Sequence, residues 1–431
     1  MIFPFRNVRD VLGLHAKVSP HKNSVIFYDA KQQRHELSYL EFVGKAHQIA
    51  NFLYEDLGIN RGDSIALASP NTENALLLCF ATWVIGASVH ILNESDDESA
   101  ISTALSDSNA RVLFVNYDLL DKFAVLAKSI TSIEGVIQIG GKQRDDFLRL
   151  EDCAANRPTT FLGDESGAKG ADIPVTGGNE RTARLSDVAL STTYHDGVAI
   201  RQTQGDLLQN ANRLSGATAL TGNQTTIATL PFHDNFVASL MTPLLTGATV
   251  VLSETFSADL FWHMVVRERA HTAVLNSENL AELVETAREH IIAGEMRFGG
   301  KIIQQDVKHF RHILTTDTDL TVEIACDFED TFGMPLITAY QPPQTSELLT
   351  LLPITLSWSH HQYWLHGNDN PSIGVPLTDL AIVDENGNRL KENEIGRLAI
   401  SGENGYLETG HSGYFRVDET GTYFYFLSLK S

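Results

Sequence analysis

The chain has 431 residues, of which 43% are hydrophobic and 20% are charged, and this composition predicts ordinary globular domains rather than disorder. Its 32 Lys and Arg residues against 54 Asp and Glu residues give a formal net charge of −22, which disfavours nucleic acid and anionic membrane surfaces as partners. The length favours about three domains or subdomains.

The cysteines and the N-terminus indicate a reducing compartment. Cys79, Cys153 and Cys326 are too few and too far apart for a disulfide framework or a zinc site, so we expect free thiols. Residues 1–13 lack the apolar run of a signal peptide, and the apolar stretch 74–92 is interrupted by polar residues and glycine. We therefore expect a cytoplasmic protein without a membrane span.

The first part of the chain alternates between helix and strand. Residues 38–58 have helical spacing, with Ser38 as the N-cap and Gly58 at the end. A short strand is expected within 61–71, a helix and a strand within 74–92, a helix over 98–110 and a strand over 111–116. This alternation predicts a parallel sheet covered on both faces. Residues 154–186 are rich in glycine and charge and are typical of a linker.

The second part resumes with a strand at 187–192 and a helix near 205–215. Further strands are expected at 225–231 and 248–253, and helices at 258–270, 278–291 and 306–314. From about residue 346 the pattern changes to short strands, with a turn at Asn386-Gly387. We expect one α/β subdomain over 1–165, a second over 166–345 and a β-rich subdomain over 346–431.

Six blocks of sequence, in order and at matching spacing, resemble the adenylate-forming superfamily of acyl-CoA synthetases, peptide-synthetase adenylation domains and luciferases. The blocks are residues 37–93, 230–252, 298–307, 328–350, 374–390 and 405–431. The resemblance implies an α/β fold of two subdomains with mainly parallel sheets plus a smaller β-rich, barrel-like subdomain. It also implies a reaction in which a carboxylate attacks ATP, with magnesium, to give an acyl-adenylate that a thiol then consumes.

The phosphate-binding loop implied by the resemblance is degenerate. The family pattern Ser-Gly-Thr-Thr-Gly-x-Pro-Lys-Gly falls on Ser191–Ala199, where Val198 replaces the lysine; a second register, anchored at Thr203-Gln204, stays open. In either register, one glycine and no lysine lie between Asp187 and Gln204. Backbone donors and positive charge are what phosphates need, so we expect an ordinary surface loop. The positions concerned are Ser191, Thr193, His195, Asp196, Gly197 and Val198.

Other positions implied by the resemblance have also changed. In the family's Tyr-Gly-x-Thr-Glu loop, Tyr340 is kept, Gln344 replaces the carboxylate that would help to hold magnesium, and Thr345 follows. His411 replaces the aspartate that would bind both ribose hydroxyls, while the double glycine is kept as Gly299 and Gly300. The family's mobile lysine lies on a further C-terminal domain, which we expect to be absent after Ser431.

Two groups of histidines allow more than one interpretation. His233, with Asn235, matches a family position at the wall of the acyl pocket, but a packed or surface histidine is equally expected there. Residues 358–367 hold three histidines and three aromatic residues. Metal binding is conceivable for this group. A β-rich surface with incidental histidines is favoured, since neither an acidic partner nor helical spacing supports a site.

These substitutions lead us to expect a pseudoenzyme that binds an acyl ligand or serves as a scaffold for a partner protein in a lipid or polyketide-like pathway, without cofactor or metal. The alternative is a diverged but active AMP-forming ligase that acts on CoA or an acyl carrier protein. That alternative needs ATP and Mg²⁺, with the missing domain supplied by a separate protein. A protein partner or self-association is expected, and nucleic acid is not. Release of pyrophosphate from ATP separates the two hypotheses.

Overall fold

A computed structural model describes residues 5–164, 183–193, 199–289, 291–292, 295–342, 347–402 and 405–428. The chain forms two compact units. The first comprises Met1–Gln209, Pro231–Phe236 and Leu252–Glu254, and the second comprises Asn210–Leu230, Val237–Val251 and Thr255–Ser431. The expected boundaries at residues 165 and 345 fall outside the described residues and stay predictions.

The first unit contains a seven-stranded sheet with the strand order β7-β6-β5-β3-β4-β8-β9. All neighbours are parallel except the β8–β9 pair, which is antiparallel. The strands are β3 (Ser64–Ala68), β4 (Ser88–Ile91), β5 (Val112–Asn116), β6 (Gly135–Ile139), β7 (Leu148–Arg149), β8 (Val188–Thr193) and β9 (Ala199–Thr203). Every residue of β5 is buried, as its apolar run predicts for a strand covered on both faces.

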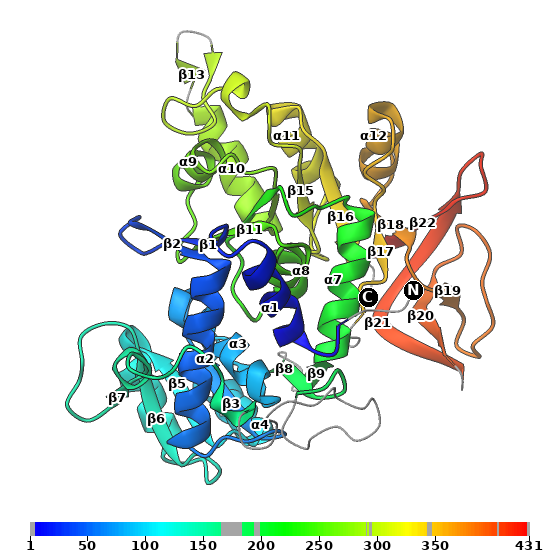
Figure 1. The fold of residues 1–431 in the computed structure, drawn as a ribbon. Coiled ribbons are helices and arrows are strands. Elements are labelled where there is room, and N and C mark those ends of the chain that lie inside the picture. The colour runs from blue at the N-terminus through cyan, green and yellow to red at the C-terminus, as the bar shows by residue number, and fades with distance from the viewer. Residues whose placement is uncertain are drawn as a thin grey trace. The chain divides into compact units, whose positions relative to one another are not determined.

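Figure 1 shows the helices of the first unit. The helix expected over residues 38–58 begins as predicted but ends at Glu55, with Asp56 as its C-cap, before Gly58. Ser38 and Glu41 form a capping box at the start of α2, and a left-handed Gly86 ends α3. Phe42 of α2 meets Phe80 of α3 edge to face, with ring centroids 5.1 Å apart. The elements are α1 (Val8–Val18), α2 (Tyr39–Glu55), α3 (Glu73–Ile85), α4 (Glu98–Ser108), α5 (Leu120–Ala127), α6 (Leu150–Ala154), the start of α7 (Gln204–Ala217), and the hairpin of β1 (Asn23–Tyr28) and β2 (Arg34–Ser38).

In the second unit the strand order is β19-β20-β21-β22-β18-β17-β16-β15-β12-β10-β11. The pairs β10–β12, β12–β15 and β15–β16 are parallel, whereas the pairs from β16–β17 through to β19–β20 are antiparallel. The strands are β10 (Thr225–Ala228), β11 (Thr249–Ser253), β12 (Thr272–Val274), β15 (His312–Thr315), β16 (Leu336–Tyr340), β17 (Thr350–Leu351), β18 (Ser372–Pro376), β19 (Leu380–Val383), β20 (Gly396–Gly402), β21 (Gly405–Val417) and β22 (Tyr423–Leu427). The expected change from an α/β to a β-rich pattern is therefore present.

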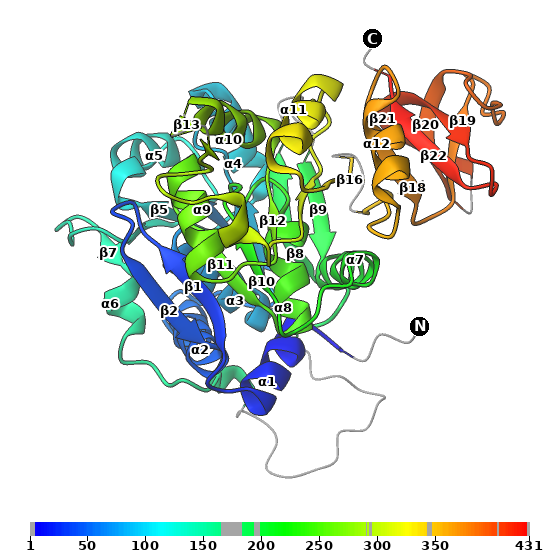
Figure 2. The same ribbon diagram turned by 90° about the horizontal axis from the view of Figure 1, so that it is seen from above.

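The helices of the second unit accompany the parallel strands, apart from α12, which lies beside β18 and β22 in Figure 2. They are α8 (Thr242–Thr246), preceded by a π-helical turn at Val237–Met241, then α9 (Ala258–Arg267), α10 (Ser277–Glu289), α11 (Val322–Phe332) and α12 (Trp358–His366). Trp364 of α12 stacks on Phe424 of β22 with ring centroids 3.9 Å apart. This stack fixes one face of α12 on the antiparallel sheet.

Two sequence predictions in this unit are wrong. Residues 306–314, expected as a helix, form the end of a 3₁₀ turn (Gln304–Val307) and then β15, which is fully buried between β12 and β16. The apparent helical spacing arose because Val307 and Phe310 pack inward from the turn. Residues 358–366, expected on a β-rich surface, form α12, whose N-cap Ser357 accepts a hydrogen bond from the His360 backbone N–H at 3.4 Å.

Two further observations concern the cysteines and the membrane. Cys79, Cys153 and Cys326 are free thiols, as their spacing predicts, and burial raises the pKa of each. Within the described part of the chain, no helix combines the length and the apolar character that a membrane crossing requires.

Candidate functional site

The stretch expected by resemblance as the phosphate loop, Ser191–Ala199, begins in β8 and ends in β9. In the sheet register, Ser191 pairs with His90 of β4 on one side and with Arg201 of β9 on the other, and Thr193 pairs with Ala199. His195, Asp196, Gly197 and Val198 lie outside the described residues, so their roles stay predictions.

Ser191 is held within the sheet. Its Oγ lies 2.8 Å from Nδ1 of His90, and both side chains are buried. Burial, reinforced by the charge of Arg201, lowers the pKa of His90 to about 4, so the imidazole is neutral at pH 7. A hydroxyl that is buried against a neutral histidine is poorly placed to contact a phosphate.

Both ends of the hairpin are fixed within the first unit. Before β8, the Arg61 Nε–H is shared between the two oxygens of Asp187, at 2.8 and 3.0 Å, and Nη2 donates to one of them at 2.5 Å. After β9, Thr203 and Asp206 form a reciprocal cap in which the Asp206 carboxylate accepts from the Thr203 N–H at 2.8 Å. These contacts fix the start of β8 and the end of β9 within the first unit.

The structure brings together two of the expected nucleotide positions, Tyr340 and His411. Tyr340 ends β16 and is fully buried, while His411 lies in β21. The Tyr340 hydroxyl lies 2.8 Å from His411 Nδ1, and the two rings are edge to face with centroids 5.7 Å apart. In this arrangement Tyr340 has no exposed ring face on which an adenine could stack.

The protonation states of this pair follow from burial. Burial raises the pKa of Tyr340. Burial also lowers the pKa of His411, an effect that the hydrogen bond to the backbone of Thr409 and the charge of Asp319 oppose only in part. Tyr340 is therefore protonated, and the neutral imidazole of His411 has one acceptor nitrogen and one N–H donor. A neutral imidazole in this state cannot accept both hydroxyls of a ribose, as an aspartate would.

Gly299 and Gly300 form a tight turn that packing explains. The Ile302 N–H donates to the Gly299 carbonyl at 2.9 Å, and Gly300 has a φ of +55°. A Cβ on Gly299 would lie 3.1 Å from Asp259 Oδ1 and 3.2 Å from the Asp259 Cα. The turn follows Phe298, which packs on Trp262 and Phe332. The scaffold therefore requires these glycines, and a nucleotide contact by them stays a prediction.

His233 and Asn235 belong to the first unit, whereas Gly299 and Gly300 belong to the second. Asn235 adopts a left-handed backbone conformation with a φ of 53°. The residues around it are held by aromatic packing, since Phe236 contacts both Phe232 and Trp83. The role of His233 and Asn235 at an acyl pocket stays a prediction, as do the roles of Gln344 and Thr345, which lie outside the described residues.

Sequence reasoning missed a buried carboxylate beside the histidines of residues 358–367. Glu329 of α11 accepts hydrogen bonds from His361 Nε2 at 2.7 Å and from the Leu336 N–H at 2.9 Å, and His366 Nε2 lies 3.1 Å from its second oxygen. The acidic partner thus exists, 32 residues before His361. Among the described residues, no group of histidine, cysteine and acidic side chains has an arrangement suited to a metal ion. The cluster joins α12 to α11.

Comparison with known proteins identifies the family. The model of the AMP-binding enzyme family matches residues 14–182 and 196–408, so the chain belongs to that family. An oxalate–CoA ligase from Arabidopsis thaliana is 24% identical over 400 residues, which cover 86% of this chain and 70% of that protein. The chain is thus a relative of the adenylate-forming acyl-CoA ligases.

Solved structures show the same fold. A putative long-chain-fatty-acid CoA ligase from Rhodopseudomonas palustris superposes with a TM-score of 0.76 at 20% identity, covering 98% of this chain and 99% of that one. ATP-bound MatB from the same organism gives a TM-score of 0.74 at 19% identity, covering 98% and 78%. The expected α/β architecture is confirmed, and MatB is a protein of this fold that was solved with ATP bound.

Proposed function

We propose that this chain is a non-catalytic member of the adenylate-forming family, which holds an acyl ligand or a partner protein of a lipid or polyketide-like pathway and forms no acyl-adenylate. The observation that carries the proposal is the Tyr340–His411 pair. By resemblance these residues would face the adenine and the ribose. Instead, the tyrosine is buried and its hydroxyl is 2.8 Å from the imidazole that replaces the ribose carboxylate.

The absence of charged groups that nucleotide binding needs also supports the proposal. Phosphates require lysine, backbone donors and a metal ion. The sequence from Asp187 to Gln204 offers no lysine, and Gln344 replaces an anionic metal ligand with a neutral amide. A charged hydrogen bond contributes about 1.5–3 kcal/mol, so losing two or three weakens ATP binding by about two to six powers of ten.

An active ligase is the second candidate, and one residue favours it. Arg201 is exposed on β9 and pairs in register with Ser191, at the base of the loop where phosphates would bind. It is the one cation between Asp187 and Gln204, and it would take over the charge of the missing lysine. The names of the chain's relatives, which are CoA ligases, also agree with this alternative.

Two measurements separate the candidates. We expect calorimetric titration with ATP and magnesium to show weak or no binding, and pyrophosphate exchange with a broad panel of carboxylic acids to stay at background. Acid-dependent exchange that is abolished by Arg201→Ala and kept in Arg184→Ala, an exposed arginine before β8, would overturn the proposal and establish the ligase.

The ligand-binding part of the proposal has its own test. An apolar acyl ligand that binds only the folded chain raises the melting temperature by mass action. We expect at least one fatty or aromatic acid in a panel to stabilise the protein, and His233→Leu to change which acids do so. No shift from any acid at saturating concentration would leave partner binding as the remaining non-catalytic role.

A further inference from the structure

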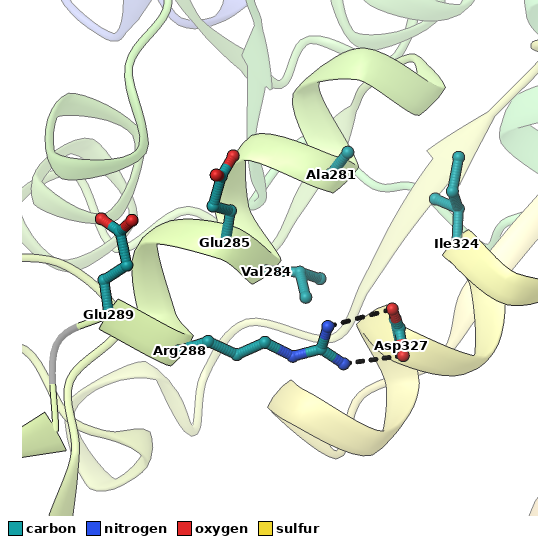
Figure 3. A pocket seen from close by; sticks show the side chains of 7 residues that line it. All are labelled: Ala281, Val284, Glu285, Arg288, Glu289, Ile324 and Asp327. Carbon is teal, nitrogen blue, oxygen red and sulfur yellow. Dashed lines mark hydrogen bonds and ion pairs between the residues drawn. The ribbon is translucent and has the colours of Figure 1, made fainter.

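A groove of about 380 Å³ lies between α10 and α11, within the second unit and built from residues other than those of the candidate nucleotide site. Figure 3 shows Ile324 on α11 across from Ala281 and Val284 on α10, with Arg288 and Asp327 facing each other at one end. The lining residues are Ala281, Val284, Glu285, Arg288, Glu289, Ile324 and Asp327.

The floor of the groove is apolar. Val284 is buried, Ile324 is partly buried and Ala281 is exposed, and together they form a small hydrophobic surface between the helices. The volume is at the low end of the range for small-molecule pockets, which is about 300–1,000 Å³. A space of this size suits a few side chains of a peptide better than a large cofactor.

The charge around this floor is negative. The Arg288 guanidinium donates to both oxygens of Asp327, at 2.7 and 3.1 Å, so the one cation of the lining is already neutralised. Glu285 and Glu289 are exposed carboxylates with no ion-pair partner among the residues that the structure describes. The groove therefore repels anions and favours a ligand that combines positive charge with apolar surface.

We propose that the α10–α11 groove docks a basic amphipathic segment of a partner protein. A lysine or arginine of that segment places its aliphatic stem on Val284 and Ile324, and its charged end at Glu285 and Glu289. A second copy of this chain fits the groove poorly, because two molecules that each carry a charge of −22 repel each other. The inference is independent of the nucleotide chemistry and holds whether or not the chain is an active ligase.

The test uses the full chain and a fluorescein-labelled amphipathic peptide of lysine and leucine, with binding followed by fluorescence anisotropy at physiological salt. The double variant Glu285→Lys/Glu289→Lys should weaken binding by about tenfold or more, since two attractive surface contacts become repulsive. The matched control is Glu385→Lys/Glu419→Lys, which reverses two exposed glutamates of the β-rich part and gives the same net charge. It should change binding by less than about twofold.

A second variant tests the floor without changing the charge. Ala281→Trp places a bulky ring over Val284 and should also weaken binding by about tenfold, whereas Ala155→Trp, at an exposed alanine of the first unit, should not. A lysine–serine peptide of equal charge should bind wild type more weakly than the lysine–leucine peptide. Thermal melting confirms that each variant is folded.

Three outcomes would overturn the proposal. Equal weakening by the two charge-reversal variants would show diffuse attraction rather than a groove. Equal binding of the lysine–serine and lysine–leucine peptides would show that the apolar floor is unused. Sedimentation of the wild-type chain as a dimer that Ala281→Trp dissociates would make a second copy the occupant.

Discussion

Replacing His361 by phenylalanine is expected to destabilise the second unit by about 3 kcal/mol, because it removes a donor from a buried carboxylate. The phenyl ring keeps the stack on Trp358, whose centroid lies 5.7 Å from that of the imidazole, but it cannot reproduce the 2.7 Å hydrogen bond to Glu329. The Leu336 N–H, 2.9 Å away, still donates, and this places the expected loss below the upper limit of about 5 kcal/mol for a broken buried pair.

The assay is urea unfolding at pH 7, followed by circular dichroism. His360→Phe is the control, since His360 is an exposed neighbour on the same helix and its replacement should change stability by less than about 0.5 kcal/mol. In Glu329→Met/His361→Phe, the buried carboxylate and its histidine donor are both replaced by apolar side chains. This double variant should be about 2 kcal/mol more stable than the sum of the single effects predicts.

Two results would refute this reasoning. Equal stability of His361→Phe and His360→Phe would show that the hydrogen bond contributes nothing. Strict additivity in the double-mutant cycle would show that Glu329 and His361 are not energetically coupled, despite the distance between them.

The remaining predictions concern pH, packing and the nucleotide site. Burial favours a raised pKa for Glu329, but the hydrogen bond from His361 and the nearby His366 outweigh it, and the pKa is lowered. The resulting stability is present above the ordinary pKa of 4.5 and is lost as pH falls through the folded value. Glu329→Met should remove this loss at acid pH, as measured by urea unfolding at several pH values. Burial lowers the pKa of His90 from 6.5 to about 4, so the free energy of unfolding should fall as pH drops between these values. His90→Gln should flatten this dependence of stability on pH, and an unchanged dependence would contradict the prediction. Gly299→Ala should cost about 1–3 kcal/mol in urea unfolding, because its Cβ meets the Asp259 backbone at 3.2 Å; a neutral result would mean that the turn can shift. The last prediction concerns a graft in which a glycine-rich loop with a lysine replaces Ser191–Ala199, together with Gln344→Glu and His411→Asp. This variant should bind ATP more tightly in calorimetry before any turnover appears. A folded graft that binds ATP no better than the wild type would mean that we have assigned the nucleotide site to the wrong residues.

Local signals predicted much of the fold. The helix over residues 38–58 was predicted from its spacing and from Ser38, and the capping box with Glu41 confirms the reason. The strand β15 was missed because its burial comes from β12 and β16, which lie far away in the sequence. The helix α12 was missed because its packing on Phe424 and its contact with Glu329 are tertiary.

The candidate site shows the same limit. Resemblance selected Tyr340 and His411 one at a time, but their contact joins residues 71 positions apart and no local pattern encodes it. The acidic partner of His361 was overlooked because it lies on another helix. The α10–α11 groove had no motif at all, since its lining combines ordinary helical positions of two separate elements.

The Tyr340–His411 hydrogen bond also sets a conformational equilibrium for any ligand that needs the tyrosine ring. Opening the pair breaks one hydrogen bond, at about 1 kcal/mol, and exposes a buried aromatic ring, at about 2 kcal/mol. The open state would then be populated at about 1%, and the apparent affinity of a ring-stacking ligand would fall by about a hundredfold. Ligands that leave the pair closed avoid this cost. Under the proposed function, the closed pair would therefore disfavour a nucleotide whose adenine must stack on Tyr340.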